Sequence, residues 1–246
     1  MKSFDYLRRG NHYYQPKTPQ TALRAVELGV LPIEAFIYMS SSVKPLYEEP
    51  YDLRELERIL FRENNDLETN LLLMQIFQVL IKNPDPEIAL FGAECINTLE
   101  SRYTTKIDHF KKRLSENWSA EEVREAASLY YDFALLNRDR TIRNYYLKEA
   151  YSLIKEISNR TALKREDGIF IVRILLALNL PNQALSILSD LAKNFGVDSE
   201  LLFLEGEINY QKRDFKRVFN SFKKMEKARN KLDLVQRGTY SFWMGD

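Results

Sequence analysis

The sequence predicts an all-α fold in which helical hairpins stack side by side into an α-α superhelix, or solenoid. Three observations lead to this prediction. After residue 87 the only proline is Pro181, so a long stretch of the chain is free to be helical. Apolar residues recur at helical spacing along most of the chain. Toward the C-terminus, apolar positions also recur every 34 residues, and such a period is typical of helical repeats.

Composition narrows the class of protein. The chain has 246 residues, of which 45% are hydrophobic and 29% charged, as in ordinary globular proteins. The net charge of +1 argues against a nucleic-acid binder steered by overall charge, although a local basic patch stays open. The single cysteine, Cys95, allows no intramolecular disulfide and fits a reducing compartment. No segment reaches the about 20 apolar residues of a membrane span, and the start lacks the apolar region of a signal peptide. We therefore expect a cytoplasmic location and no transmembrane segment.

The N-terminal half divides into two predicted regions. Residues 1–50 are expected to hold two helices, over 21–30 and 32–43, and an extended segment. Residues 51–118 are expected to hold a helix capped by Asp52, a second over 66–82, a sharp corner at NPDP, and one long helix from 86 to 114. One face of that long helix carries Ile88, Phe91, Cys95, Leu99, Tyr103, Ile107, Phe110 and Leu114. The corner and the helix after it resemble a HEAT-type repeat.

The C-terminal region, residues 119–246, is expected to be a run of helical pairs with a C-terminal cap. Ser119, followed by Glu122, predicts a capping box for a helix that ends near Leu136. Another helix is expected to begin at Thr141. Four more are predicted at 167–178, 182–194, 199–211 and 215–229, and a last short one at 231–238. The aromatic tail, residues 239–246, is interpreted as a cap over the last apolar face, with a partner-binding segment as the alternative.

The repeat is anchored by Ala150, Ala184 and Val218, which follow one another at intervals of 34 residues. The residues four and seven positions later are apolar in every case: Ile154, Leu188 and Phe222, then Ile157, Leu191 and Met225. This period and Gly206, Asp214-Phe215 and Phe222 resemble the tetratricopeptide repeat. A glycine inside a helix costs about 1 kcal/mol relative to alanine. We therefore expect a neighbouring helix to approach Gly206 closely.

Two candidate binding surfaces follow from the repeat. The first helix of each pair should line a concave groove, with Ile169 and Ala177 beside the partner-binding candidates Arg173, Phe203, Glu207, Tyr210 and Gln211. The alternative is that these residues pack against the next helix. The second surface is a basic patch made of Lys212, Arg213, Lys216, Arg217, Lys223, Lys224 and Lys227, with Arg229 and Lys231. It is either a solvated outer face or a docking patch for an acidic partner, anionic lipid headgroups or nucleic acid.

No motif for catalysis or cofactor binding emerges. His12 and His109 are far apart, and Cys95 lies on an apolar helix face, where a buried small hydrophobe is the favoured interpretation. No glycine-rich phosphate loop is present. We expect no catalytic residue, no metal, no cofactor and no small-molecule substrate. The rival interpretation is a helical enzyme built from dispersed carboxylates, which would need a deep polar cleft with several converging Glu or Asp residues.

Three segments carry a narrower resemblance: ALFGAECINTLESRY, LYYDFALLNRDRTIRNYYLKEAYSLIKE and EGEINYQKRDFKRVF. Together they resemble the tetratricopeptide-type E component of the bacterial Pel exopolysaccharide locus, over roughly residues 68 to 228. This resemblance implies a scaffold at the cytoplasmic face of the inner membrane, in the assembly of an exopolysaccharide synthase involved in biofilm formation. The implied partners are a cyclic-di-GMP receptor, a glycosyltransferase and a membrane transporter component. The alternative function is a nucleic-acid-binding solenoid that uses the basic patch.

Overall fold

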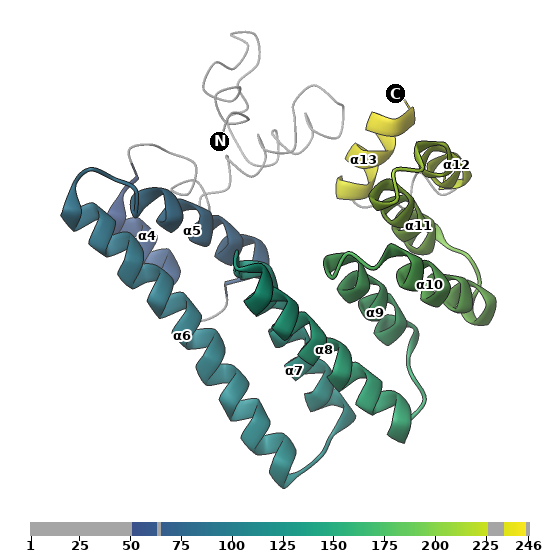
Figure 1. Ribbon diagram of the computed structural model, residues 1–246, viewed down its shortest axis with the longest axis horizontal. Helices are drawn as coiled ribbons and strands as arrows, with labels where there is room; N and C mark the ends of the chain where they lie inside the picture. The colour runs from purple at the N-terminus through teal and green to yellow at the C-terminus, as the bar shows by residue number, and fades with distance from the viewer. Residues whose placement is uncertain (1–50, 63–64, 226–233, 245–246) are drawn as a thin grey trace. The chain divides into compact units, whose positions relative to one another are not determined.

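The computed structural model describes residues 51–62, 65–225 and 234–244, and within these ranges every regular element is a helix (Figure 1). The all-α prediction is confirmed for this part of the chain. The predicted N-terminal region, residues 1–50, with its helices at 21–30 and 32–43, lies outside the described residues. The chain divides into two compact units, Met1–Ser101 and Arg102–Asp246. The division falls within a helix, whereas the predicted boundary at 118–119 falls in a connection between two helices.

Three helices account for the described part of the first unit and the start of the second. They are α4 (Leu53–Leu60), α5 (Leu67–Leu80) and α6 (Pro86–Glu116). The side chain of Asp52 caps α4 as predicted, because it accepts hydrogen bonds from the backbone N–H groups of Arg54 and Glu55 at 3.0 and 3.3 Å. Asp66 caps α5 in the same way. The long helix α6 matches its predicted range, and the middle of its predicted apolar face is buried.

Helices α5 and α6 come closest at Gly92. A Cβ atom at this position would lie 2.9 Å from the backbone oxygen of Phe77 and 3.0 Å from the backbone nitrogen of Ile81. The obstacle is main chain, which cannot rotate away as a side chain can. Phe91, next to Gly92, meets the ring of Phe77 edge-on, with centroids 6.3 Å apart. The absence of a side chain at Gly92 therefore allows the two helices to pack backbone to backbone.

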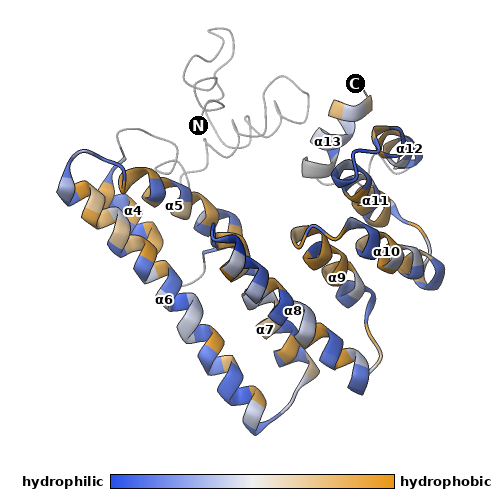
Figure 2. Cartoon of the chain, viewed as in Figure 1, coloured by the Kyte–Doolittle hydropathy of each residue, from blue (hydrophilic) through white to orange (hydrophobic). Residues whose placement is uncertain are grey.

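The rest of the second unit is built from seven helices that follow one another along the chain. They are α7 (Ala120–Leu136), α8 (Arg140–Arg160), α9 (Arg165–Ala177), α10 (Pro181–Phe195), α11 (Ser199–Gln211), α12 (Phe215–Met225) and α13 (Leu234–Met244). Each packs on the next along the chain, and α9 also contacts α11. In Figure 2, α9 and α11 are coloured mainly as hydrophobic and α12 carries many hydrophilic residues. The helices α9 and α11 are thus more hydrophobic in composition than α12.

Several predicted helix ends need correction. Ser119 precedes α7, but its side chain makes no capping hydrogen bond, so the predicted capping box is absent. The side chain of Glu122 pairs with Arg113 of α6. The cap of α8 is Asp139, so that helix begins before the predicted Thr141. Helix α13 extends to Met244, beyond the predicted end at 238. The predicted continuation of α12 to residue 229 lies outside the described residues.

The 34-residue period is present in the backbone itself. Helices α9 and α11 have 13 residues each, and both their first and their last residues are 34 apart. The turn after each helix contains a residue in the left-handed region, Asn179 with φ 60° and Arg213 with φ 59°, again 34 apart. The N–H of the residue that follows each of them donates to the carbonyl oxygen five residues earlier, at 2.8 and 2.9 Å. The hairpins α9–α10 and α11–α12 therefore share one turn geometry.

The first pair, α7–α8, departs from this pattern. Helix α10 begins at Pro181, so the period would place the start of α8 at residue 147, but α8 begins at Arg140. The connection between α7 and α8 is accordingly displaced relative to the two later turns. In the sequence, the apolar spacing of the first helix of that pair is also shifted relative to the later pairs.

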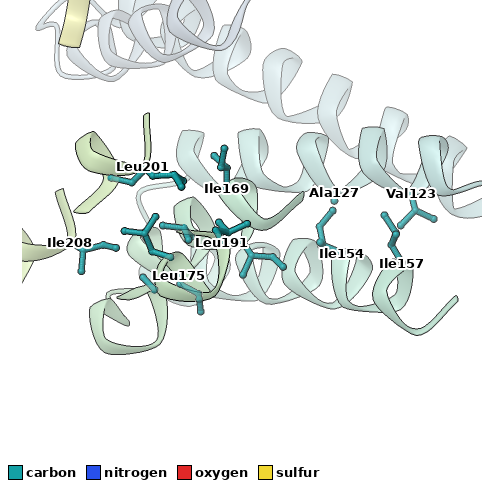
Figure 3. Packing of buried hydrophobic residues seen from close by; sticks show 14 residues of the cluster. Val123, Ala127, Ile154, Ile157, Ile169, Leu175, Leu191, Leu201 and Ile208 are labelled. Atoms are coloured by element: carbon teal, nitrogen blue, oxygen red, sulfur yellow. The ribbon is translucent and has the colours of Figure 1, made fainter. Parts of the chain in front are cut away.

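The anchor positions of the repeat lie in equivalent places. Ala150, Ala184 and Val218 lie on α8, α10 and α12, and each is 0% exposed. The residues four and seven positions later are also buried in all three helices. A continuous core runs through α7, α8, α9, α10 and α11. Figure 3 shows this core, with Val123 opposite Ile157 and Ala127 opposite Ile154 between α7 and α8. The apolar seam is thus continuous from α7 to α11, whereas Val218 of α12 belongs to a second cluster with Tyr240.

The end of the described chain covers the last apolar face. Tyr240 of α13 is 3% exposed and belongs to a cluster with Val218, Phe222 and Met225 of α12. Trp243 stacks on Phe222 with an interplanar angle of 15°. The interpretation of the aromatic tail as a cap agrees with this packing. Without this cap, the apolar side of α12 would be open to water.

Candidate functional site

A groove of about 860 Å³ runs along the first helices of the three pairs. Helix α7 contributes Tyr131 and Leu135, α9 contributes Arg173, Leu176 and Ala177, and α11 contributes Glu200, Phe203, Glu207 and Gln211. The connection between α7 and α8, together with the first turns of α8, adds Arg138, Arg140, Arg143 and Asn144. The groove therefore combines apolar and aromatic side chains with four guanidinium groups and two carboxylates.

Most of the predicted groove residues line this groove. Arg173, Phe203, Glu207 and Gln211 do so, and Ala177 lies with them. Gln211 also ties two first helices together, since its side-chain amide donates to the carbonyl oxygen of Leu176 at 2.9 Å. These residues come from α9 and α11, the two helices that repeat most regularly.

Two predicted groove residues lie elsewhere. Ile169 is 6% exposed and belongs to the core. Tyr210 is exposed but is not among the residues that line the groove. Its ring instead meets the rings of Phe215 and Trp243 edge-on, with centroids 6.0 and 6.2 Å away. Tyr210 is therefore corrected from a groove residue to a member of an aromatic cluster at α11, α12 and α13.

Three arginines of the groove were missed by the sequence analysis. Arg138, Arg140 and Arg143 lie around the displaced α7–α8 connection, which the 34-residue pattern does not describe. The carboxylate of their neighbour Asp139 accepts hydrogen bonds from the backbone N–H groups of Thr141 and Ile142, at 2.7 and 3.0 Å. These hydrogen bonds lower the pKa of Asp139. The only sequence signal was the density of basic residues in NRDRTIR.

These arginines lack acidic partners within the described part of the chain. None of the three forms an ion pair there, and the buried Nε of Arg143 has no hydrogen-bond acceptor. By contrast, Glu200 is held by Arg165 at 3.0 Å and by Arg173 at 3.7 Å. The carboxylate of Glu200 is thus already compensated, while three guanidinium groups at the other side of the groove are available to an anion.

The remaining titratable groups of the groove influence one another. Burial raises the pKa of Glu207, and the nearby Arg173 opposes that shift. Burial also raises the pKa of Tyr131, while Arg173 and Arg143 oppose it. Burial therefore disfavours the charged form of Glu207, and the charge of Arg173 favours it.

The basic patch lies on the outer side of the last hairpin. Lys212, Arg213, Lys216, Arg217, Lys223 and Lys224 are all exposed, and Lys227, Arg229 and Lys231 lie outside the described residues. Arg217 pairs with Asp214 at 3.2 Å and Lys224 with Glu205 at 3.9 Å. The other four cations have no ion pair within the described residues. The patch thus keeps a positive charge even after these two pairs are counted.

Three observations bear on catalysis and on the rival enzyme interpretation: the pKa of Cys95, the search for metal ligands, and the charge of the groove. Burial, together with Glu57 and Glu94, raises the pKa of the Cys95 thiol to about 11, whereas a nucleophilic cysteine needs a lowered pKa. Among the described residues, no group of three His, Cys, Asp or Glu side chains is placed to hold a metal ion. In the same residues, no helix is long and apolar enough to span a bilayer. The groove holds arginines in excess over carboxylates, which differs from the carboxylate-rich cleft that the rival requires.

No protein-family model matches the chain, and neither the curated proteins nor the solved structures include a match. A proposal for its function therefore depends on the groove, the basic patch and the repeated hairpins.

Proposed function

We propose that the chain is a non-catalytic scaffold for protein interactions, and that its groove receives an acidic segment of a partner protein. The observation that carries this proposal is the set Arg138, Arg140 and Arg143, which face a groove of about 860 Å³ without carboxylate partners in the described part of the chain. A guanidinium group binds a carboxylate through two parallel hydrogen bonds, so it favours Asp and Glu side chains.

The groove favours a polypeptide over a uniformly charged polymer. Leu135, Leu176, Ala177 and Phe203 offer apolar contacts to the side chains of an extended peptide. A nucleic acid carries one negative charge at every unit but has no aliphatic side chains to fill these contacts. A segment that alternates acidic and apolar residues satisfies both the arginines and the apolar contacts.

The repeated hairpins support the scaffold class. Stacked helical pairs of the tetratricopeptide type present an extended surface and make no covalent bond. The setting we propose, the assembly of an exopolysaccharide synthase at the cytoplasmic face of the inner membrane, draws on the resemblance to the Pel E component. Under this proposal a cyclic-di-GMP receptor or a glycosyltransferase would supply the acidic segment.

The test compares two variants that change the net charge equally. Arg140→Glu/Arg143→Glu reverses charge in the groove, and Lys223→Glu/Lys224→Glu reverses it on the basic patch. Each protein is cross-linked in native cells and its partners are identified, and circular dichroism checks that both variants are folded. We expect the groove variant to lose partners that the wild type and the patch variant both retain. Identical partner sets for all three proteins would remove the groove from the proposal.

A direct measurement complements the cross-linking. A labelled peptide of alternating glutamate and leucine should bind the wild type in fluorescence anisotropy, and its lysine counterpart should not. Binding should weaken at higher salt, because exposed charges are screened over about 10 Å at 0.1 M ionic strength. Equal binding of the two peptides would show that charge does not select the occupant.

Nucleic-acid binding through the basic patch is the second candidate. It is favoured by two exposed lysines of α12: Lys223, which forms no ion pair within the described residues, and its neighbour Lys224. This candidate expects steeply salt-dependent binding to RNA or DNA that Lys223→Glu/Lys224→Glu weakens uniformly across sequences. A filter-binding titration at two salt concentrations decides it.

A further inference from the structure

The aromatic cluster at α11, α12 and α13 lies beside the basic patch and is separate from the groove. Three of its members are strongly exposed: Tyr210 at 58%, Phe215 at 52% and Phe242 at 79%. Trp243 joins them, because its ring lies 6.2 Å from those of Tyr210 and Phe215 and 5.7 Å from that of Phe242. Three helices thus build one contiguous apolar surface, and contiguous exposed apolar surface marks an interaction site.

Cations border this surface. Lys212 and Arg213 form the turn between Tyr210 and Phe215, and Lys216 follows Phe215 directly. All three are exposed and have no ion pair within the described residues. The single acid of the turn, Asp214, accepts from the backbone N–H of Arg217 at 3.1 Å and pairs with its side chain. Its charge is therefore engaged, and the border stays positive.

We propose that this surface, here called the aromatic–basic tip and made of Tyr210, Lys212, Arg213, Phe215, Lys216, Phe242 and Trp243, docks directly onto an anionic lipid bilayer. Aromatic rings favour the interfacial zone of a bilayer, where their apolar edges leave water. Lysine and arginine beside them are attracted to anionic headgroups by about 1 kcal/mol each. The tip supplies both contributions on one surface, and it acts independently of the groove and of the function proposed for it.

The ring geometry favours lipid over single-stranded nucleic acid. Bases bind proteins by stacking on open aromatic faces. Here Trp243 is stacked on Phe215 at an interplanar angle of 25° and on Phe222 at 15°. The near-parallel neighbours of Trp243 are thus rings of the protein itself, and the projecting Phe242 meets Trp243 at 90°. This arrangement suits insertion of Phe242 into an apolar phase better than stacking of a base on Trp243.

Charge complementarity also distinguishes the tip from the groove. The groove mixes guanidinium groups with two carboxylates, whereas the only acid within the tip's own turn is engaged by Arg217. A bilayer surface presents many anionic headgroups without fixed positions, so exposed flexible lysines are sufficient to bind it. An occupant with fixed carboxylates would instead require the ordered arginines found in the groove.

The experiment measures co-sedimentation with two kinds of vesicle, phosphatidylcholine alone and phosphatidylcholine mixed with phosphatidylglycerol. We expect binding to the anionic vesicles only, and roughly tenfold or more weaker binding for Lys212→Glu/Lys216→Glu, given the headgroup attraction per charge. Lys111→Glu/Lys112→Glu on α6 makes the same change of charge away from the tip and should bind like the wild type. Equal loss in both variants would mean that only net charge matters and would overturn the proposal.

The apolar contribution is tested separately by Phe242→Ser, because this side chain is 79% exposed and its loss should not unfold the chain. Phe195→Ser, at an exposed position on α10, is the matched control. In a Trp118→Phe background, lipids brominated near the headgroup should quench Trp243 fluorescence. Unchanged binding of Phe242→Ser, unquenched Trp243, or binding to oligonucleotides but not to anionic vesicles would each overturn bilayer docking.

Discussion

Arg124 of α7 and Asp167 of α9 form a two-point ion pair across neighbouring hairpins. Nε of Arg124 donates to one carboxylate oxygen at 2.7 Å and Nη2 donates to the other at 2.9 Å. Asp167 is 3% exposed, and the backbone N–H of Lys164 donates to it as well, at 2.9 Å. Burial by itself would raise the pKa of Asp167, but these hydrogen bonds and the charge of Arg124 hold it below its usual value.

Arg124→Met should lower the free energy of unfolding by about 2–4 kcal/mol, because it leaves a buried carboxylate without its cation. Urea unfolding followed by circular dichroism measures the loss. The double variant Arg124→Met/Asp167→Asn should lose less than the sum of the single variants. Arg58→Met, which removes an exposed pair with Glu55, should cost only about 0–1 kcal/mol. Additive losses would mean that the two side chains do not depend on each other.

The same pair predicts a pH dependence. The folded pKa of Asp167 lies below its unfolded value near 3.8. Its stabilisation is therefore fully present above that value and is lost as pH falls through the folded pKa. Wild-type stability should decline toward pH 3 more steeply than that of Asp167→Asn.

Asp132 should show the opposite behaviour. Burial raises its pKa from 3.8 to about 6, so the folded state favours the protonated form. The stabilisation from that proton is present below the unfolded pKa and is lost as pH rises through about 6. Asp132→Asn, which stays neutral, should gain roughly 1–3 kcal/mol over the wild type at pH 7, and most of the gain should be lost near pH 4. Thermal melts across this range measure it, and a gain independent of pH would contradict the burial of a charge.

Gly206 is predicted to tolerate no large side chain. A Cβ there would lie 2.9 Å from Cζ of Phe222, which is 1% exposed. Gly206→Leu should destabilise the second unit by about 1–3 kcal/mol, and adding Phe222→Ala should cost less than the two single losses combined, because each change makes room for the other. Gly238→Leu is the control, since nothing lies within 4 Å of its Cβ position. An unchanged melting temperature for Gly206→Leu would contradict close packing at this position.

Cys95 should react slowly in the folded protein. It is 5% exposed and its pKa is about 11, so little thiolate forms at neutral pH. Labelling with a chromogenic disulfide should be at least about 100-fold slower than for the exposed thiol of Ser128→Cys in a Cys95→Ala background. In denaturant the two thiols should react at similar rates. Fast labelling of native Cys95 would indicate that its helix opens readily.

Local signals in the sequence were sufficient for most helices. The predicted helix at 199–211 has the observed bounds, because Asp198 caps its start and the turn at Arg213 ends it. The buried anchor positions were predictable because each repeat needs an apolar residue there, so such residues recur at a fixed interval. They are Ala150, Ala184 and Val218. Gly92, by contrast, lies outside the 34-residue repeat, and its contact with the α5 backbone became visible only in the structure.

The groove was predictable only where the repeat is regular. Arg173, Phe203 and Glu207 follow from their positions on α9 and α11, whereas the arginines near residue 140 belong to a displaced turn that no period describes. Tyr210 was misplaced because its ring contacts Phe215 and Trp243, and Trp243 comes from a helix that the repeat does not describe. The capping box at Ser119 was wrong, and the pairing of Glu122 with Arg113 on another helix is a contact that a local motif cannot reveal.

The equal lengths of α9 and α11, and the matching turns that follow them, restrict how this part of the chain can change in evolution. Each residue added to or removed from a helix turns everything beyond it by about 100°, which carries Val218 and the apolar residues after it off the seam. A duplicated or lost segment of 34 residues leaves that phase intact. Insertions of other sizes are tolerable only in connections such as Gly196-Val197, where Val197 is 64% exposed and the glycine has open space around it. Related chains should therefore differ in length by whole hairpins or by loops at that junction.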